Sequence, residues 1–359
     1  MLTFHHYQIE EELSQRSHST LYRAVHRYSR QTVAIKVYTD SFLRDEREQA
    51  DFAHWAERWA QCGADCGLVP LLEWGVHGKK PYLVMPLMNR GTLRDRLEMS
   101  PHLGQSVILD VWVRVAYALE TLHGIGLCHG WLTPSLIFFD RENRPYLGGL
   151  RFNKGDASRL AEGIYLEGGA LLEDVAYRDP ARLKDGVIRE DGDWYAFAVL
   201  MYEMLAGRPI FSCRSISDMI SYQLKAAPLS LSDQVLGALG RHIVMHGLAK
   251  DRQDRPSDIL NTYLKLTGLE RRPLIINGRK ELNRSSRSLT HQGQTSWQDF
   301  DPEERMNRFG EYETDILTEP SQIDQELRET GQLRRAFLLF FGVVFLVTIG
   351  LVFFIVAGL

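Results

Sequence analysis

The chain changes character at Pro86, from short strand-like runs to long helical ones. Before this residue, runs rich in β-branched and aromatic residues alternate with turn residues, as in QTVAIKVY and LVPLLEWGV. After it, residues 107–123 repeat apolar side chains at helical spacing, and residues 194–207 are apolar almost all round. This order predicts an α+β fold, with a strand-rich small lobe followed by a helical large lobe.

Three regions differ in composition. Residues 1–269 mix apolar runs with turn signals and are long enough for a sizeable core. Residues 270–335 are rich in Arg, Glu, Ser, Gln and Asn, which predicts a flexible polar linker. Residues 336–358 lie in a final stretch without a single charged residue.

The last stretch is long enough to cross a membrane. As a helix with a rise of ~1.5 Å per residue it would extend about 36 Å, against ~30 Å for a hydrocarbon core. Arg334 and Arg335 precede it, which favours a cytoplasmic location for that side. We therefore expect a single-pass membrane protein with one C-terminal transmembrane helix and its main domain in the cytoplasm.

Charge and cysteine content exclude some classes of protein. The formal net charge of -4 gives no reason to expect a nucleic-acid partner. The four cysteines are too few and too scattered for a disulfide framework, which favours a reducing compartment.

Seven segments follow one another in an order and spacing that define a known pattern. They are VAIK (33–36), YLVMPLMNRGTLRDRL (82–97), LHGIGLCHGWLTPSLIFFD (122–140), PYLGGLR (145–151), AYRDPARL (176–183), DWYAFAVLMYEMLAGRPIF (193–211) and KDRQDRPS (250–257). Together they resemble the protein kinase fold along essentially the whole of residues 1–269, and the overall pattern is similar to Ser/Thr kinases. The resemblance implies a two-lobed kinase-like domain.

The resemblance also shows which catalytic positions have changed. Phosphoryl transfer in this family uses a glycine-rich loop, a lysine, a catalytic aspartate and two magnesium ligands. The three glycine positions are occupied by Ser14, Arg16 and Ser19, which favours an ordinary polar hairpin there.

The catalytic-loop positions have lost their charged chemistry. Trp131 stands at the position of the catalytic base and Thr133 at that of the loop lysine. Leu136 and Gly149 stand where the family places its magnesium ligands, and neither offers an oxygen. Gly130 replaces the arginine that usually docks an activation-loop phosphate. We therefore expect no catalytic residue and no metal site.

Lys36 is the one ionisable active-site residue that remains. By spacing, Glu57 is its best partner and Glu48 the alternative. Lys36 either fixes the small-lobe helix through such an ion pair or still binds a nucleotide phosphate. The hinge at Met85 and Met88 offers backbone groups to an adenine whatever its side chains are. We expect no cofactor, with weak ATP binding that needs no magnesium as the alternative.

Two arginines raise separate questions. Arg151 stands at the last position of the metal-binding motif. Its positive charge either occupies part of the space where the metal ion would lie, or faces solvent. Asp179, Pro180 and Ala181 replace the usual Ala-Pro-Glu, so that Arg255 loses the glutamate with which it ordinarily pairs. Because a buried unpaired arginine is costly, we expect Arg255 to find another acceptor or to lie near solvent.

These observations favour a catalytically inactive kinase-like domain at the cytoplasmic face of a membrane, acting as a regulator or scaffold for a cytosolic protein. Family analogy suggests an active kinase as this partner. The alternative is an unorthodox ATP-dependent kinase or nucleotidyl transferase that uses Lys36 with relocated acids such as Asp156. A third hypothesis is a scaffold that never binds nucleotide.

Overall fold

The computed structural model describes residues 3–16, 18–62, 66–152, 169–231, 237–256, 274–276 and 279–281. The chain divides into two compact units, Met1–Phe309 and Gly310–Leu359, and all described residues belong to the first. The predicted span 336–358 therefore lies outside the described residues. Within the described part, every helix is too short or too polar to cross a membrane.

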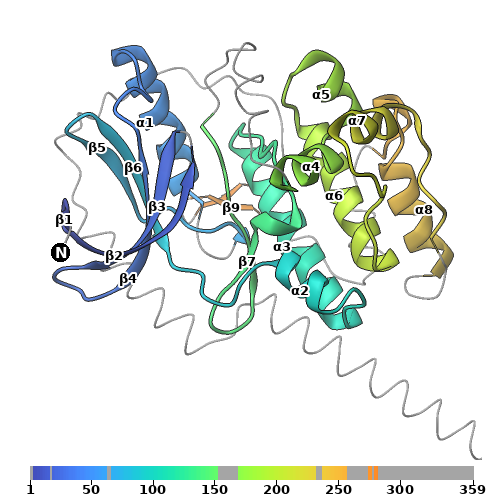
Figure 1. Cartoon of the computed structure of the whole chain (residues 1–359), viewed down its shortest axis with the longest axis horizontal. Coiled ribbons are helices and arrows are strands. Elements are labelled where there is room, and N and C mark those ends of the chain that lie inside the picture. The colour runs from blue at the N-terminus through green and yellow to red at the C-terminus, as the bar shows by residue number, and fades with distance from the viewer. Residues whose placement is uncertain are drawn as a thin grey trace, which may run out of the picture. The chain divides into compact units, whose positions relative to one another are not determined.

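The small lobe is a six-stranded antiparallel sheet with one helix, α1, beside it (Figure 1). Its strands lie in the order β1-β2-β3-β4-β6-β5. Their bounds are β1 Thr3–Phe4, β2 Tyr7–Arg16, β3 Ser19–His26, β4 Thr32–Tyr38, β5 Glu73–His77 and β6 Lys80–Pro86. Alternate side chains from five of these strands meet in an apolar core that includes Tyr7, Ile35 and Val84.

The hairpin between β2 and β3 replaces a glycine-rich loop. Its pairing shifts register twice, between Ile9 and Glu11 and between Glu12 and Ser14, and continues to Arg16 opposite Ser19, in agreement with the predicted polar hairpin. Since Ser14, Arg16 and Ser19 all carry side chains, backbone N–H groups here are less open to a phosphate than those of glycines.

Helix α1 (Glu46–Ala60) begins at Asp45, whose carboxylate accepts a hydrogen bond from Glu48 N at 2.8 Å. Four residues at helical spacing form its buried face: Phe52, Trp55, Ala56 and Trp59. Through this apolar face the helix is buried in the domain.

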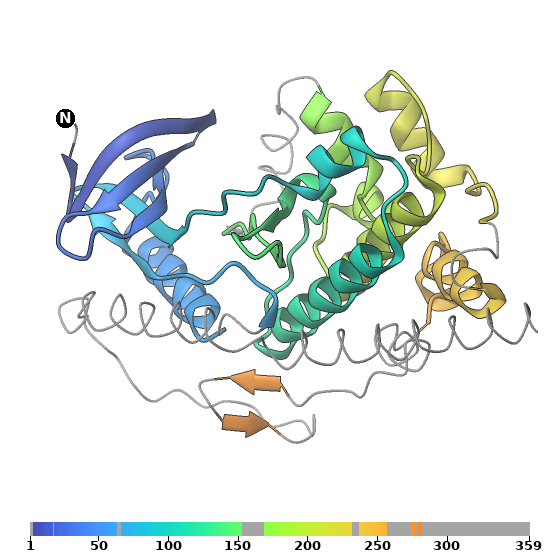
Figure 2. The same ribbon diagram turned by 90° about the horizontal axis from the view of Figure 1, so that it is seen from below.

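The large lobe is mainly helical, as predicted (Figure 2). Its elements are α2 Leu93–Met99, α3 Gln105–Gly124, η2 Pro134–Leu136, β7 Ile137–Phe139, β8 Pro145–Leu147, α4 Gly169–Ala176, α5 Pro180–Asp185, α6 Glu190–Ala206, α7 Ile216–Lys225, α8 Gly237–Gly247 and η5 Arg252–Asp254. A separate two-stranded hairpin pairs β9 (Leu274–Ile276) with β10 (Arg279–Glu281).

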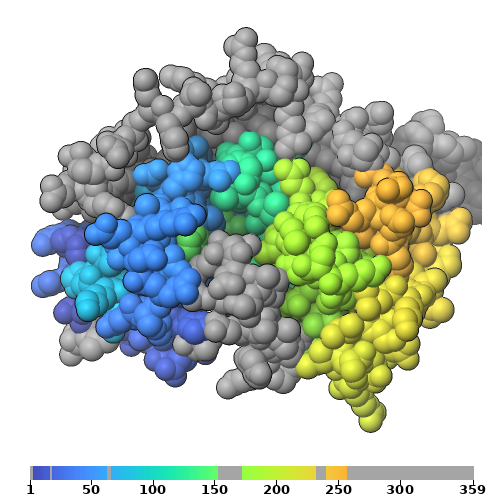
Figure 3. Space-filling view, turned by 90° about the horizontal axis from the view of Figure 1, so that it is seen from above, coloured from blue at the N-terminus to red at the C-terminus, as the bar shows by residue number. Residues whose placement is uncertain are grey.

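Helix α6 is the buried centre of this lobe, which confirms the prediction from its apolar sequence. It is enclosed on most sides and packs against both α3 and α8. Helix α3 is buried more completely than its periodicity predicted, because Val113, Arg114 and Ala118 are enclosed as well as the expected face. In the space-filling view of Figure 3, α7 and α8 (yellow to orange) form the outer part of the lobe beyond the green segment of α4 to α6.

Candidate functional site

The catalytic-loop segment is held in shape by Asp193 from the first turn of α6. Its carboxylate accepts hydrogen bonds from the backbone N–H groups of His129 at 2.7 Å and Gly130 at 2.6 Å. It also accepts one from His123 Nε2 at 2.9 Å. Because Asp193 is only 1% exposed, these three bonds fix the loop backbone from inside the lobe.

The ring of His129 adds a second anchor to the same loop. Its Nε2 donates to the carbonyl of Gly148 at 2.9 Å, so that Nδ1 is the acceptor for the N–H of Trp131 at 3.3 Å. Burial lowers the pKa of this imidazole, which favours the neutral ring that this bonding needs. The structural half of the loop is therefore intact.

The grouping of His123, Cys128 and Asp193 has the composition of a metal site, with ligand atoms within 4.8 Å of one another. However, both carboxylate oxygens of Asp193 already accept N–H groups, one of them from His123. Burial is the main cause of the raised pKa of the Cys128 thiol, which therefore stays protonated and is a poor ligand. The cluster supports the loop and does not fit a metal ion.

Trp131 occupies the base position with an aromatic ring between two cations. The guanidinium carbon of Arg151 lies 4.9 Å from the ring centroid and that of Arg182 lies 4.6 Å away. Arg182 also donates a hydrogen bond from Nη1 to the carbonyl of Gly130. An indole in this position has no atom that accepts a proton from a substrate hydroxyl.

The two positions of the magnesium ligands pack against each other. A Cβ atom on Gly149 would lie 2.6 Å from Leu136 Cδ2, far inside contact distance. The φ angle of Gly149 is +76°, which also favours glycine. Thr133, at the loop lysine position, is buried. Between Leu136 and Gly149 there is apolar contact where the family holds a metal ion.

Lys36 lies in β4, opposite Leu83 of β6, and is half-buried. Its Nζ is 4.9 Å from the ring centroid of Tyr38. Burial lowers the pKa of Lys36 to about 7, helped by the positive charges of Arg151 and Arg16. Among the described residues, no carboxylate forms an ion pair with it.

The prediction that Glu57 pairs with Lys36 is not met by the structure. Glu57 is exposed on α1, one residue beyond the buried Ala56 and so on the other side of the helix. The alternative, Glu48, instead accepts a hydrogen bond from Arg44 Nε at 2.7 Å. Counting residues to the family position found the right helix but the wrong face.

An aromatic cluster takes the place of that ion pair. The ring of Phe152, just after the metal-binding segment, lies 5.5 Å from that of Phe52 and 5.7 Å from that of Trp55, both on α1. These contacts join α1 to the catalytic region without charge.

The hinge residues lie where the sequence placed them. Met85 is the penultimate residue of β6 and pairs with Ala34 of β4, while Met88 follows in the link to α2. Both side chains are half-buried. Asp156, the acid named for the unorthodox enzyme, lies outside the described residues.

A partly buried charge network beside the catalytic loop was not predicted from the sequence. Arg94 of α2 donates to Glu203 of α6 at 2.7 and 3.2 Å and to Glu173 of α4 at 3.0 Å. Glu173 also accepts the hydroxyl of Ser135 in the catalytic-loop segment at 2.6 Å, and Glu203 accepts that of Tyr177. The one sequence signal was Glu203, a lone acid inside the apolar run of α6.

Arg255 finds another acceptor, which was one of the two outcomes expected for it. Its Nη2 lies 2.6 Å from Asp179 Oδ1, and its other donors reach the carbonyls of Ala249 and Asp191. The side chains of both Arg255 and Asp179 are almost fully buried. The segment before α5 is therefore tied to the end of the lobe.

Comparison with known proteins agrees with this geometry. The model of the protein kinase domain matches residues 7–262. Serine/threonine-protein kinase PknL of Mycobacterium tuberculosis is 27% identical over 261 residues, which cover 71% of this chain and 63% of that protein. Serine/threonine-protein kinase PknK of Mycobacterium bovis is 24% identical over 266 residues, covering 73% of this chain and 23% of that protein.

The chain thus spans less than two thirds of the length of these relatives. The family-model match covers most of the described residues. On the match of residues 7–262, the chain belongs to the protein kinase family.

Proposed function

We propose that this chain is a catalytically inactive kinase-like domain that regulates or scaffolds a cytosolic protein at the cytoplasmic face of a membrane. The observation that carries the proposal is Trp131, whose ring fills the base position between Arg151 and Arg182. General-base assistance contributes ~10²–10⁴-fold to such reactions, and an indole supplies none of it.

The packing of Leu136 against Gly149 supports the same conclusion for the metal. Magnesium needs oxygen ligands in near-octahedral geometry, and neither residue has one. The retained catalytic-loop structure and central helix support a role that depends on the kinase fold and not on phosphoryl transfer. An active kinase is the partner that this shape suggests, and nucleic acid is not expected.

The positive charges around Lys36 support binding of an anion without a metal. Lys36, Arg16 and Arg151 lie close enough for their charges to lower the pKa of Lys36. These positive charges would neutralise part of the negative charge of a nucleotide phosphate, which is the part that magnesium plays in active kinases. We therefore propose weak ATP binding that does not require magnesium.

The membrane part of the proposal comes from residues 336–358 and the arginines before them. Extraction of cell membranes at alkaline pH tests it, because a spanning helix stays in the pellet. A chain ended before Ala336 should then appear in the supernatant.

Two measurements on the full-length chain in detergent test the proposed activity. The first is the thermal shift with ATP, in magnesium and in EDTA. We expect a small shift of equal size in both, which disappears in Lys36→Ala. The second is phosphotransfer to a general protein substrate, for which we expect no signal above background.

A shift that requires magnesium would overturn the proposal, as would phosphotransfer that Lys36→Ala abolishes. That result would favour the unorthodox enzyme, for which the specific observation is a Lys36 with a pKa of about 7, able to act as a neutral amine. No shift in either condition would favour a scaffold that never binds nucleotide.

A further inference from the structure

Arg182 has a buried pair of donors that nothing in the described part of the chain satisfies. It lies on α5, is 6% exposed, and uses Nη1 for the carbonyl of Gly130. Its Nε and Nη2 are buried and find no acceptor among the described residues. These two atoms form the edge of a guanidinium group that holds a carboxylate or phosphate with two parallel hydrogen bonds.

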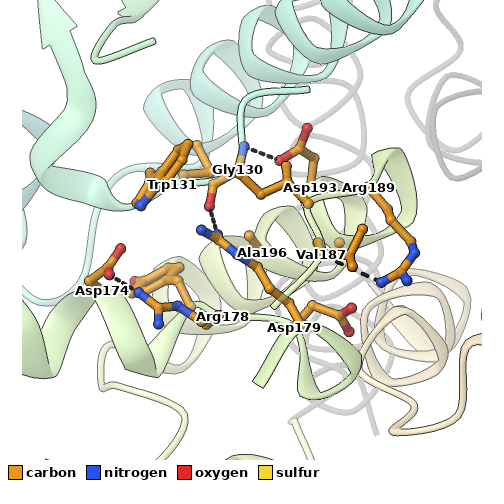
Figure 4. A pocket seen from close by; sticks show the side chains of 14 residues that line it. Gly130, Trp131, Asp174, Arg178, Asp179, Val187, Arg189, Asp193 and Ala196 are labelled. Carbon is orange, nitrogen blue, oxygen red and sulfur yellow. Dashed lines mark hydrogen bonds and ion pairs between the residues drawn. The ribbon is translucent and has the colours of Figure 1, made fainter. Parts of the chain in front are cut away.

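The unpaired edge belongs to a hollow in the large lobe (Figure 4). Figure 4 shows Gly130 and Trp131 on one side and Arg178 on the opposite one, and Arg182 also lines the hollow. Its free space is about 10 Å³, roughly the minimum that one water molecule needs. Val187, a lining residue that is 47% exposed, marks a rim that is open to solvent.

A second arginine in the hollow is also incompletely paired. Arg178 donates from Nη2 to Asp174, but its Nε is buried without an acceptor in the described structure. Together the two arginines present three orphan donor atoms. A tetrahedral anion with three terminal oxygens matches three such donors better than a planar carboxylate with two oxygens.

Two of the three acids that line the hollow are engaged by other partners. Asp179 pairs with Arg255, and Asp193 accepts the N–H groups of the catalytic-loop segment. Asp174 pairs with Arg178, and the charges of Asp174 and Asp193 also act on Arg182.

Burial and the neighbouring Arg178 lower the pKa of Arg182 to about 10, so that Arg182 stays charged at neutral pH. A buried cation with unmade hydrogen bonds costs free energy that an anion would offset.

We propose that this hollow binds the phosphoryl group of a phosphate monoester, with Arg182 as the bidentate ligand and Arg178 as the second. One phosphoryl oxygen enters the hollow, and the organic group lies at the rim beside Val187. Lys36 is not among the residues that line this site. The site also does not use the catalytic-loop arginine of the family, because that position is Gly130.

Calorimetric titration of the full-length chain in detergent tests the site with three probes: phenyl phosphate, inorganic phosphate and benzoate. We expect phenyl phosphate to bind with a stoichiometry of one, and at least tenfold more tightly than benzoate. If phenyl phosphate binds more tightly than inorganic phosphate, the ligand is an ester. If the two bind equally tightly, the ligand is free phosphate. Affinity should rise between pH 5 and pH 7.5, because the second pKa of a phosphate monoester is about 6.

Variants assign the binding to Arg182. Arg182→Gln and Arg182→Lys should both weaken phenyl phosphate binding at least tenfold, since lysine keeps the charge but lacks the fork. Lys184→Gln removes an exposed charge from the same helix and should leave the affinity within twofold. Should Arg182→Gln fail to fold, Arg182→Lys carries the comparison.

Hydrogen–deuterium exchange of the wild-type chain is a second test, which does not depend on the variants. Phenyl phosphate should slow deuterium uptake in residues 177–189. Unchanged deuterium uptake in these residues would overturn the proposed site. So would the absence of phenyl phosphate binding at millimolar concentration, or an Arg182→Lys affinity for phenyl phosphate equal to that of the wild type. Benzoate that binds as tightly as phenyl phosphate would overturn it as well. Binding that only Lys36→Ala abolishes would place the phosphate in the nucleotide cleft and would also overturn it, while leaving the proposed function intact.

Discussion

Asp179 and Arg255 form a buried ion pair across 76 residues of sequence, with Oδ1 and Nη2 2.6 Å apart. In the family pattern the acid is the glutamate of Ala-Pro-Glu, but here the motif is Asp-Pro-Ala. The acid has moved to the residue that precedes α5, and Arg255 still reaches it. The structural tie at the end of the activation segment is therefore retained with its charge two residues earlier.

Removing Asp179 should leave Arg255 as an uncompensated buried cation. We expect Asp179→Ala to lower the free energy of unfolding by about 3–5 kcal/mol, the range for a buried pair that loses one partner. Urea denaturation of the full-length chain measures the loss. Asp185→Ala breaks the exposed pair with Arg189 and is the matched control, with an unchanged midpoint expected. A loss in Asp179→Ala no larger than in the control would contradict the importance of the pair.

The aromatic cluster at α1 predicts a second loss of stability. Phe152→Ala removes the ring that contacts both Phe52 and Trp55. Because Phe152 is only half-buried, we expect a cost of about 2 kcal/mol, below the range of 3–5 kcal/mol for a fully buried phenylalanine.

The same titration measures this cost, with Tyr28→Ala, an aromatic residue that is 71% exposed, as control. Equal midpoints for the two variants would mean that the cluster does not hold α1.

The large-scale fold could be predicted because it depends on patterns that a sequence displays directly. The apolar run of α6 directly indicates a buried helix, and the runs before Pro86 directly indicate strands. The pairing of Lys36 could not be predicted in this way. Residue spacing located α1, but which of its residues face inward depends on the rotation of the helix, and Glu57 is one position away from the buried face.

The substitutions at the catalytic positions could be read from the sequence, but the contacts that the new residues make could not. Trp131 and Gly149 can be read directly from the sequence, which predicts that a base and a metal ligand are missing at these positions. That Arg182 would reach the carbonyl of Gly130 depends on contact between segments 52 residues apart. The bridge from Arg94 to Glu203 spans 109 residues, and no local pattern indicates such a pairing.

The contact between Gly149 and Leu136 predicts that a side chain at residue 149 is costly in two ways. Gly149→Ala introduces a Cβ 2.6 Å from Leu136 Cδ2 and places alanine at a positive φ angle. We expect a loss of about 2–4 kcal/mol in unfolding free energy, which combines overpacking with backbone strain.

A glycine elsewhere separates the two contributions. Gly78 has a φ of +66° but nothing within 4 Å of an added Cβ, so that Gly78→Ala measures backbone strain alone. We expect it to cost about 1 kcal/mol. Leu136→Ala combined with Gly149→Ala should cost less than the sum of the single variants, because the smaller side chain relieves the contact. Strict additivity would show that Leu136 and Gly149 do not clash.

Lys36 predicts a dependence of stability on pH whose sign is opposite to that of a salt-bridged lysine. Its pKa falls from 10.5 in the unfolded chain to about 7 in the folded one, because burial disfavours the charged amine. Between these two values the unfolded chain binds the extra proton, so this residue makes stability rise with pH. Its penalty is fully present below pH 7 and disappears above about pH 10.5.

Replacing the amine by an apolar group of similar length should remove that penalty. We expect Lys36→Met to raise the free energy of unfolding by about 2–4 kcal/mol at pH 6, since each pKa unit corresponds to about 1.4 kcal/mol. At pH 9 the gain should be less than half as large, because about two of the three and a half pKa units between the folded and unfolded values have been crossed. Urea titrations at both pH values measure the difference, with the exposed Lys184→Met as control. A gain of equal size at both pH values would show that Lys36 keeps an ordinary pKa, and a loss at pH 6 would show that it has an anionic partner.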